Sequence, residues 1–225
     1  TVRELAYIKD FVVSSVVISQ EAPLHKFEEL YRKIIDGMRI VDNKKIPAFS
    51  LILEEWLLNI EEKVIEFDDL DPDVNKKKFQ EEMYRRINEE LQTVGSIAAS
   101  FANAIRAFYR AKYAGDTVVS QGAIAWLKGE NIRADIKKSL GVVGTVTREN
   151  SFEFFRALLH MIKSAGYKGL MVILDEVETV QKLQTANMRN NAYENLRFFI
   201  DEVDKNNFQN CFFLYTGTTD LMESE

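Results

Sequence analysis

The chain has 225 residues, of which 46% are hydrophobic, and this is enough for a domain with an apolar core of its own. Its formal net charge of −6 argues against a non-specific nucleic-acid binder, so DNA contact has no support from charge. The single cysteine, Cys211, excludes an internal disulfide and favours the reducing cytoplasm, and no apolar run approaches the ~20 residues of a membrane-spanning helix.

A helix, a strand and a second helix are predicted at the start of the chain. Residues 2–9 have helical spacing of apolar side chains, and the β-branched run over 11–18 favours a strand. A helix is predicted over 24–39 from the same kind of spacing. We assign residues 1–40 to the first part of an α/β core. Because the chain begins without Met, in what resembles the middle of a helix, we expect a fragment of a longer protein.

Residues 41–140 break this order, because their apolar residues follow helical spacing and no clear strand is found. The acidic run 68–73 predicts a loop. The apolar spacing over 79–108 predicts one long helix, or two joined near Gly95. We therefore expect a large all-helical insertion. We interpret the basic residues of this insertion as a solvated helix face, and a nucleic-acid contact is the alternative. These residues are Lys76, Lys77, Lys78, Arg85, Arg86, Arg106, Arg110 and Lys112.

Residues 141–225 are assigned to the second part of the α/β core. A helix is predicted over 151–165, and the apolar run that follows it ends in the adjacent carboxylates Asp175 and Glu176. Such a run fits a strand buried on both faces of a parallel sheet, and the acidic pair is the pattern of a Walker B strand. In that interpretation Asp175 holds Mg²⁺ and Glu176 polarises the water that attacks the γ-phosphate of ATP. The alternative is a buried strand whose first polar residues only start a loop.

An amphipathic helix is predicted over 188–205, with its apolar face formed by Tyr193, Leu196, Phe199, Ile200 and Val203. A second apolar strand is predicted over 211–215, and it ends in Thr216-Gly217-Thr218. If the two strands are parallel, their carboxyl ends open on the same edge of the sheet. Thr216 and Thr218 are the candidates for contact with the γ-phosphate of ATP. An ordinary turn is the alternative interpretation.

No Gly-x-x-x-x-Gly-Lys-Ser/Thr run is present, although a P-loop requires one to hold phosphates. We expect this loop just before Thr1, since residues 2–9 resemble the end of the helix that follows it. The predicted fold class is therefore α/β, a mostly parallel sheet of the P-loop NTPase type flanked by helices and carrying the helical insertion. His25 and His160 lack metal-ligand spacing, and neither Arg189 nor Arg197 is selected as an arginine finger.

Several stretches resemble the ATP-binding domain family of BREX phage-defence systems. The most specific are the run Asp175-Glu176-Val177-Glu178 and the Thr-Gly-Thr segment, and shorter matches are 11–14, 22–25, 30–32, 126–130 and 148–150. The resemblance implies a P-loop ATPase related to the AAA+ group, with ATP and Mg²⁺ as cofactors and other phage-defence proteins as partners. It also implies that a Walker A strand lies between the Walker B and sensor strands, so a gap is expected between the two strands present here.

Three hypotheses follow. The first is an ATPase core that hydrolyses ATP in the full-length protein and is inactive as this fragment alone. The second is a catalytically inactive assembly module with a degenerate ATPase fold. The third is a Mg²⁺-dependent phosphohydrolase that uses Asp175, Glu176 and Asp220 as ligands. Oligomerisation is left open.

Overall fold

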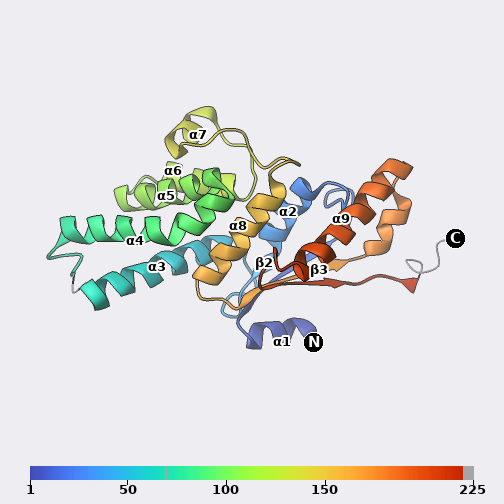
Figure 1. The fold of residues 1–225 in the computed structure, drawn as a ribbon, viewed down its shortest axis with the longest axis horizontal. Helices are drawn as coiled ribbons and strands as arrows, with labels where there is room; N and C mark the ends of the chain where they lie inside the picture. The colour runs from blue at the N-terminus through green and yellow to red at the C-terminus, as the bar shows by residue number, and fades with distance from the viewer. Residues whose placement is uncertain (69, 220–225) are drawn as a thin grey trace. The chain divides into compact units, whose positions relative to one another are not determined.

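The computed structural model describes residues 1–68 and 70–219, and these form four strands and ten helical segments (Figure 1). The chain packs into two compact units. The first comprises Thr1–Phe49, Val146–Lys163 and the chain from Tyr167 onward, and the second comprises Ser50–Thr145 and Ser164–Gly166.

A four-stranded mixed sheet lies at the centre of the first unit. Its strands are β1 (Phe11–Val17), β2 (Met38–Arg39), β3 (Gly169–Asp175) and β4 (Cys211–Tyr215), in the order β2-β1-β3-β4. β3 pairs in parallel with both β1 and β4, whereas β2 pairs antiparallel with β1. The helical segments of this unit are α1 (Val2–Ile8), α2 (Phe27–Gly37), α8 (Ser151–Ser164), the 3₁₀ segment η1 (Val177–Lys182) and α9 (Ala186–Asp204). The architecture is therefore α/β.

Helices cover the two faces of this sheet unequally (Figure 1). On one face, Ala6 and Tyr7 of the short helix α1 pack against Val13, Met171 and Ile173. The opposite face is covered by α2, α8 and α9 (Figure 1), and aromatic rings of these helices and of β4 pack there. Within this group the ring of Phe213 in β4 stacks on Phe199 of α9 at 5.0 Å and lies 6.1 Å from Phe155 of α8, as measured between centroids.

The buried strand predicted ahead of Asp175 is confirmed. Every residue from Leu170 to Leu174 is at most 8% exposed, because β1 and β4 flank the strand and helices cover both faces. An uninterrupted apolar run is what such a position requires, since neither face of the strand meets water.

One strand was not predicted from the sequence. Met38, expected within a helix over 24–39, begins β2 and pairs with Ser14, because α2 ends at Gly37. A Cβ at position 37 would lie 2.7 Å from Oγ of Ser14 and 3.1 Å from the carbonyl oxygen of Ser15. Glycine therefore lets the end of α2 approach β1 closely enough for the chain to add a short antiparallel strand.

The expectation of a gap between the Walker B-like and sensor-like strands is wrong. β3 and β4 pair directly, from Leu170 opposite Cys211 to Leu174 opposite Tyr215. Direct pairing satisfies backbone N–H and C=O groups that a gap would leave without partners.

The apolar face predicted for α9 also needs correction. Tyr193 is 41% exposed, Ile200 is 52% exposed and Val203 is 36% exposed, although all were expected to face the core. Phe199 is fully buried, and with Ala192 and Glu202 it forms a narrow buried stripe. Phe198 also packs on Phe152, with ring centroids 4.1 Å apart, but the helix leaves three of its predicted core residues on its outer side.

Among the described residues of the second unit, helices are joined by loops and no strand is present. It contains α3 (Phe49–Asp68, whose first residue lies in the first unit), α4 (Lys76–Ile97), α5 (Ala99–Ala114), α6 (Thr117–Leu127) and α7 (Ala134–Leu140). Of the two alternatives left open for 79–108, one long helix or two joined near Gly95, the structure shows two helices. They are separated at Ala98, whose backbone is extended (φ −144°, ψ 91°). Gly115 ends α5 in the left-handed region at φ 73°, and the side chain of Asp116 caps α6 by accepting the N–H of Val119.

Candidate functional site

The carboxyl ends of β3 and β4 bring Asp175 and Thr216 together. Thr216 Oγ1 donates a hydrogen bond of 2.6 Å to Oδ1 of Asp175, and the N–H of Thr216 donates to the carbonyl of Leu174 at 2.9 Å. The parallel register explains why the two residues are neighbours. Leu174 lies opposite Tyr215, and Asp175 and Thr216 are the residues that follow them in the sequence. Both side chains are exposed at the edge of the sheet.

The Asp175 carboxylate has one oxygen engaged and one available. Oδ1 accepts the Thr216 hydroxyl and also the N–H of Glu176 at 3.0 Å. Within the described part of the chain no hydrogen bond reaches Oδ2, and no group of three or more His, Cys, Asp or Glu residues could hold a metal ion. Asp175 therefore offers one oxygen ligand, and a cation there would take its others from water or phosphate. Mg²⁺ is commonly held in that way, by one or two carboxylates with waters and substrate phosphates.

Glu176 occupies an unusual backbone conformation. Its φ of 58° and ψ of 40° lie in the left-handed region, which costs a residue with a Cβ roughly 1–2 kcal/mol. The residue is exposed and immediately precedes η1, where the N–H of Thr179 donates to its carbonyl at 3.0 Å. Strained residues of this kind gather at active sites and switch segments. The turn gives Asp175 and Glu176 different backbone settings although they are adjacent.

Glu178 belongs to the same cluster, and the sequence did not assign it a role. Its Oε2 atom is buried and has no hydrogen-bond partner among the described residues. The same oxygen lies 2.7 Å from where a Cβ on Gly217 would be, so Glu178 packs over the segment between Thr216 and Thr218. The Asp-Glu-Val-Glu run was the available signal, but the contact across to Gly217 depends on how the strands pair.

The other predicted site residues are less constrained. Thr218 is exposed, and no hydrogen bond among the described residues joins it to Asp175. Asp220, which the phosphohydrolase hypothesis needs as a ligand, lies outside the described residues. The structure therefore assembles Asp175, Glu176 and Thr216 at one edge, with Glu178 beside them.

A family model described as BREX system ATP-binding protein BrxC/D matches residues 1–225. The chain belongs to this family. The resemblance inferred from the Asp-Glu-Val-Glu run and the Thr-Gly-Thr segment is thereby confirmed. No curated protein and no solved structure matches the chain.

Several side chains of this BrxC/D-family chain have structural partners instead of a place at the strand ends. Arg189 Nη1 donates to the carbonyl of Leu183 at 2.7 Å, whereas Arg197 is largely exposed and lies 4.0 Å from the Asp201 carboxylate. Cys211 is buried in β4, and burial raises the pKa of its thiol. A protonated, buried thiol is a poor nucleophile, so we assign Cys211 to the core.

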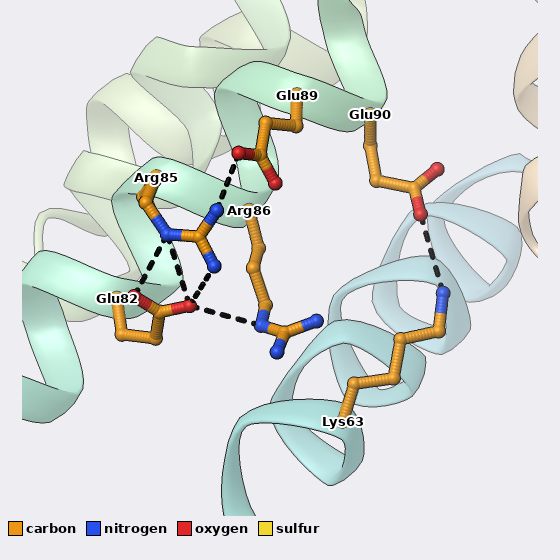
Figure 2. Close-up of polar contacts among 6 residues, drawn as sticks. All are labelled: Lys63, Glu82, Arg85, Arg86, Glu89 and Glu90. Carbon is orange, nitrogen blue, oxygen red and sulfur yellow. Dashed lines mark hydrogen bonds and ion pairs between the residues drawn. The ribbon is translucent and has the colours of Figure 1, made fainter. Parts of the chain in front are cut away.

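The two arginines of α4, Arg85 and Arg86, are paired with carboxylates of the same unit (Figure 2). Arg85 contacts both Glu82 and Glu89, and Arg86 Nε donates to Glu82 at 3.1 Å. The hydrogen bond from Arg85 lowers the pKa of Glu82. Lys63 of α3 lies 3.2 Å from Glu90 (Figure 2). These pairs support the interpretation of a solvated helix face for this BrxC/D-family chain. Across the described residues, no helix is long and apolar enough to span a membrane.

Proposed function

We propose that this chain supplies the Walker B and sensor strands of a P-loop-type ATPase core, which acts with other proteins of a BREX phage-defence system. The observation that carries the proposal is the 2.6 Å contact between Thr216 Oγ1 and Asp175 Oδ1 across two neighbouring parallel strands. Carboxyl edges of parallel sheets are where open α/β folds bind ligands. Family membership supports ATP as the ligand.

In this proposal the adjacent carboxylates have separate tasks. Asp175 directs its free oxygen to Mg²⁺, which supplies charge stabilisation to the phosphates when bound. Glu176 is one residue further along and turned by the left-handed backbone, so its carboxylate is assigned to the attacking water. Aligning and polarising that water acts mainly in the transition state.

The hydroxyl of Thr216 is assigned to the γ-phosphate. It donates to Asp175 in the present arrangement, and the same proton is suited to a phosphate oxygen. Thr218 is the second candidate, because it follows on the same exposed segment. Glu178 is proposed to hold this segment through its contact with Gly217.

A strand carrying a phosphate-binding loop is proposed to add at the outer edge of β4. β3 and β4 are already paired, and within the described residues β4 pairs with β3 alone. Phe212 of β4 is 52% exposed and lines an apolar hollow with Val2 and Leu5 of α1. We also propose that residues 41–140 are a helical insertion in this core, which the all-helical second unit supports.

The test is Mg²⁺-ATP binding by the full-length protein, measured by isothermal titration calorimetry. Asp175→Ala should weaken binding by about tenfold or more, since a carboxylate ligand to the ion is lost. Asp204→Ala, which removes an exposed carboxylate at the end of α9, is the matched control and should change affinity by less than about twofold. Equal affinity of wild type and Asp175→Ala would remove the Walker B assignment.

A non-enzymatic assembly module remains the second candidate. It is favoured by one observation, the lack of a Gly-x-x-x-x-Gly-Lys-Ser/Thr run in these 225 residues. The two candidates differ in turnover: the ATPase requires phosphate release by the full-length protein that depends on Glu176, whereas the module requires none.

A further inference from the structure

A cleft lies in the first unit, beside the carboxyl end of β1. It has a volume of about 460 Å³ and is formed by the end of β1, the segment before α2, η1 and the start of α9. Its inner wall includes Ile18, Leu24 and Val180, each at most 3% exposed. Ligand sites for small molecules have volumes of roughly 300–1,000 Å³ and combine apolar walls with a few polar groups.

The charged residues of this cleft are cations. Lys26 and Lys182 line it, and no Asp or Glu is among its lining residues, although the chain carries a net charge of −6. Lys26 also pairs with Glu29 at 2.8 Å, whereas Lys182 has no ion pair within the described residues. Burial lowers the pKa of His25, and the positive charge of Lys26 lowers it further, so the imidazole adds no charge at neutral pH. An anion is the ligand that this lining favours.

The wall of the cleft is hydrogen-bonded to the backbone of the proposed catalytic pair. The N–H of Ile18 donates to the carbonyl of Asp175 at 2.8 Å, and the N–H of Thr179 donates to the carbonyl of Glu176 at 3.0 Å. Thr179 Oγ1 also donates to the carbonyl of Ile18 at 3.4 Å. The connecting segment η1 is a 3₁₀ turn that follows the strained residue Glu176, and strained residues cluster at ligand clamps and switch segments.

We propose that this cleft binds a small organic anion with an apolar body, and that its occupancy fixes η1 and with it the backbone of Glu176. The anionic end lies between Lys26 and Lys182, and the body packs on Leu24 and Val180. Any consequence of this binding for ATP turnover, through the position of Glu176, rests on the proposed ATPase function. Binding of the anion and the ordering of η1 do not, because neither needs ATP.

Anilinonaphthalene sulfonate is a suitable probe, since it is an organic anion with an aromatic body. Fluorescence titration of the 225-residue chain should give a Kd that Lys182→Glu raises by about tenfold or more, because attraction becomes repulsion. Met188→Trp, which fills the cleft without changing its charge, should raise it as well. Lys168→Glu is the matched control, an exposed lysine outside the cleft, and should leave Kd within about twofold.

Competition identifies the source of the anion. Displacement of the probe by octanoate indicates an aliphatic carboxylate, and displacement by AMP indicates a nucleoside phosphate. Displacement by neither, or a Kd that Lys182→Glu leaves unchanged, overturns the proposal.

Hydrogen exchange tests the link to Glu176. Amides over 176–183 should exchange about threefold or more slowly with the probe bound to wild type, and no more slowly when it is added to Lys182→Glu. Binding without this protection would overturn the link. Asp175→Ala should keep the probe affinity even where it loses Mg²⁺-ATP, so failure of this site and failure of the proposed ATPase are distinguishable.

Discussion

A Cβ atom on Gly217 would lie 2.7 Å from Oε2 of Glu178. The loop after β4 and the first turn after β3 are therefore in close contact, and a side chain at position 217 would require the end of the Glu178 side chain to move. This contact joins the segment of Thr216 to the segment of Glu176, and it gives the first prediction.

Gly217→Ala should destabilise the 225-residue chain by no more than about 1 kcal/mol, because the added methyl only has to displace the flexible end of the Glu178 side chain. Urea denaturation measures the change in unfolding free energy. Glu178→Ala removes the obstructing carboxylate, so the double variant should lose less than the sum of the two single losses. Additive losses would show that the two residues do not oppose each other.

Glu176→Gln should separate ATP binding from ATP turnover in the full-length protein. The amide keeps the size of the side chain but cannot polarise water, so turnover should fall by about 10²-fold or more. Affinity for ATP should stay within about a few-fold, because the metal is assigned to Asp175. An ATP-bound state should accumulate, and any ATP-dependent complex should persist.

The control for that measurement is Glu194→Gln, which makes the same exchange at an exposed position of α9. It should turn over ATP at the wild-type rate. A near wild-type rate for Glu176→Gln as well would leave Asp175 and Glu176 as the ordinary start of a loop.

Two glycines should respond to alanine with opposite signs. Gly37→Ala places a Cβ 2.7 Å from Ser14 Oγ and 3.1 Å from the Ser15 carbonyl, so we expect a loss of about 1–3 kcal/mol. Gly95→Ala lies within α4, where the Cβ would be 3.7 Å from Cβ of Ala102, an ordinary contact. Alanine there should stabilise the chain by about 0.5–1 kcal/mol, through helix propensity.

Thermal and urea unfolding of the two alanine variants checks this pair. A stability loss at Gly37 together with a gain at Gly95 supports the close approach of α2 to β1. Equal responses would contradict it.

The parts of the fold that could be predicted are those in which the local pattern and the packing agree. The run Leu170–Leu174 predicts β3 because a strand covered on both faces has to be apolar throughout. Parallel strands alone place Asp175 and Thr216 at the same edge of the sheet, whereas their direct contact requires β3 to pair with β4. The break at Ala98 lies close to Gly95, where the sequence left open a division into two helices.

The remaining features depend on contacts that no local pattern carries. Met38 and Arg39 form too short a strand for a period of two to be visible, and their pairing follows from the close approach at Gly37. Which strands pair directly depends on tertiary packing and not on the local sequence, so a gap between β3 and β4 was wrongly expected. Ile200 is apolar but exposed, because α9 reaches the core only along a narrow stripe. The role of Glu178 became visible only through its contact with Gly217.

The left-handed backbone of Glu176 lowers the stability of the fold, whereas the proposed function requires a carboxylate at this position. Glycine would adopt that turn without steric cost, but it would remove the carboxylate. A library of variants selected only for folding or heat resistance should therefore enrich glycine here, and it would lose the carboxylate to which hydrolysis is assigned in the proposed function. An engineering programme on this chain would need to hold position 176 fixed, or to select for turnover at every round.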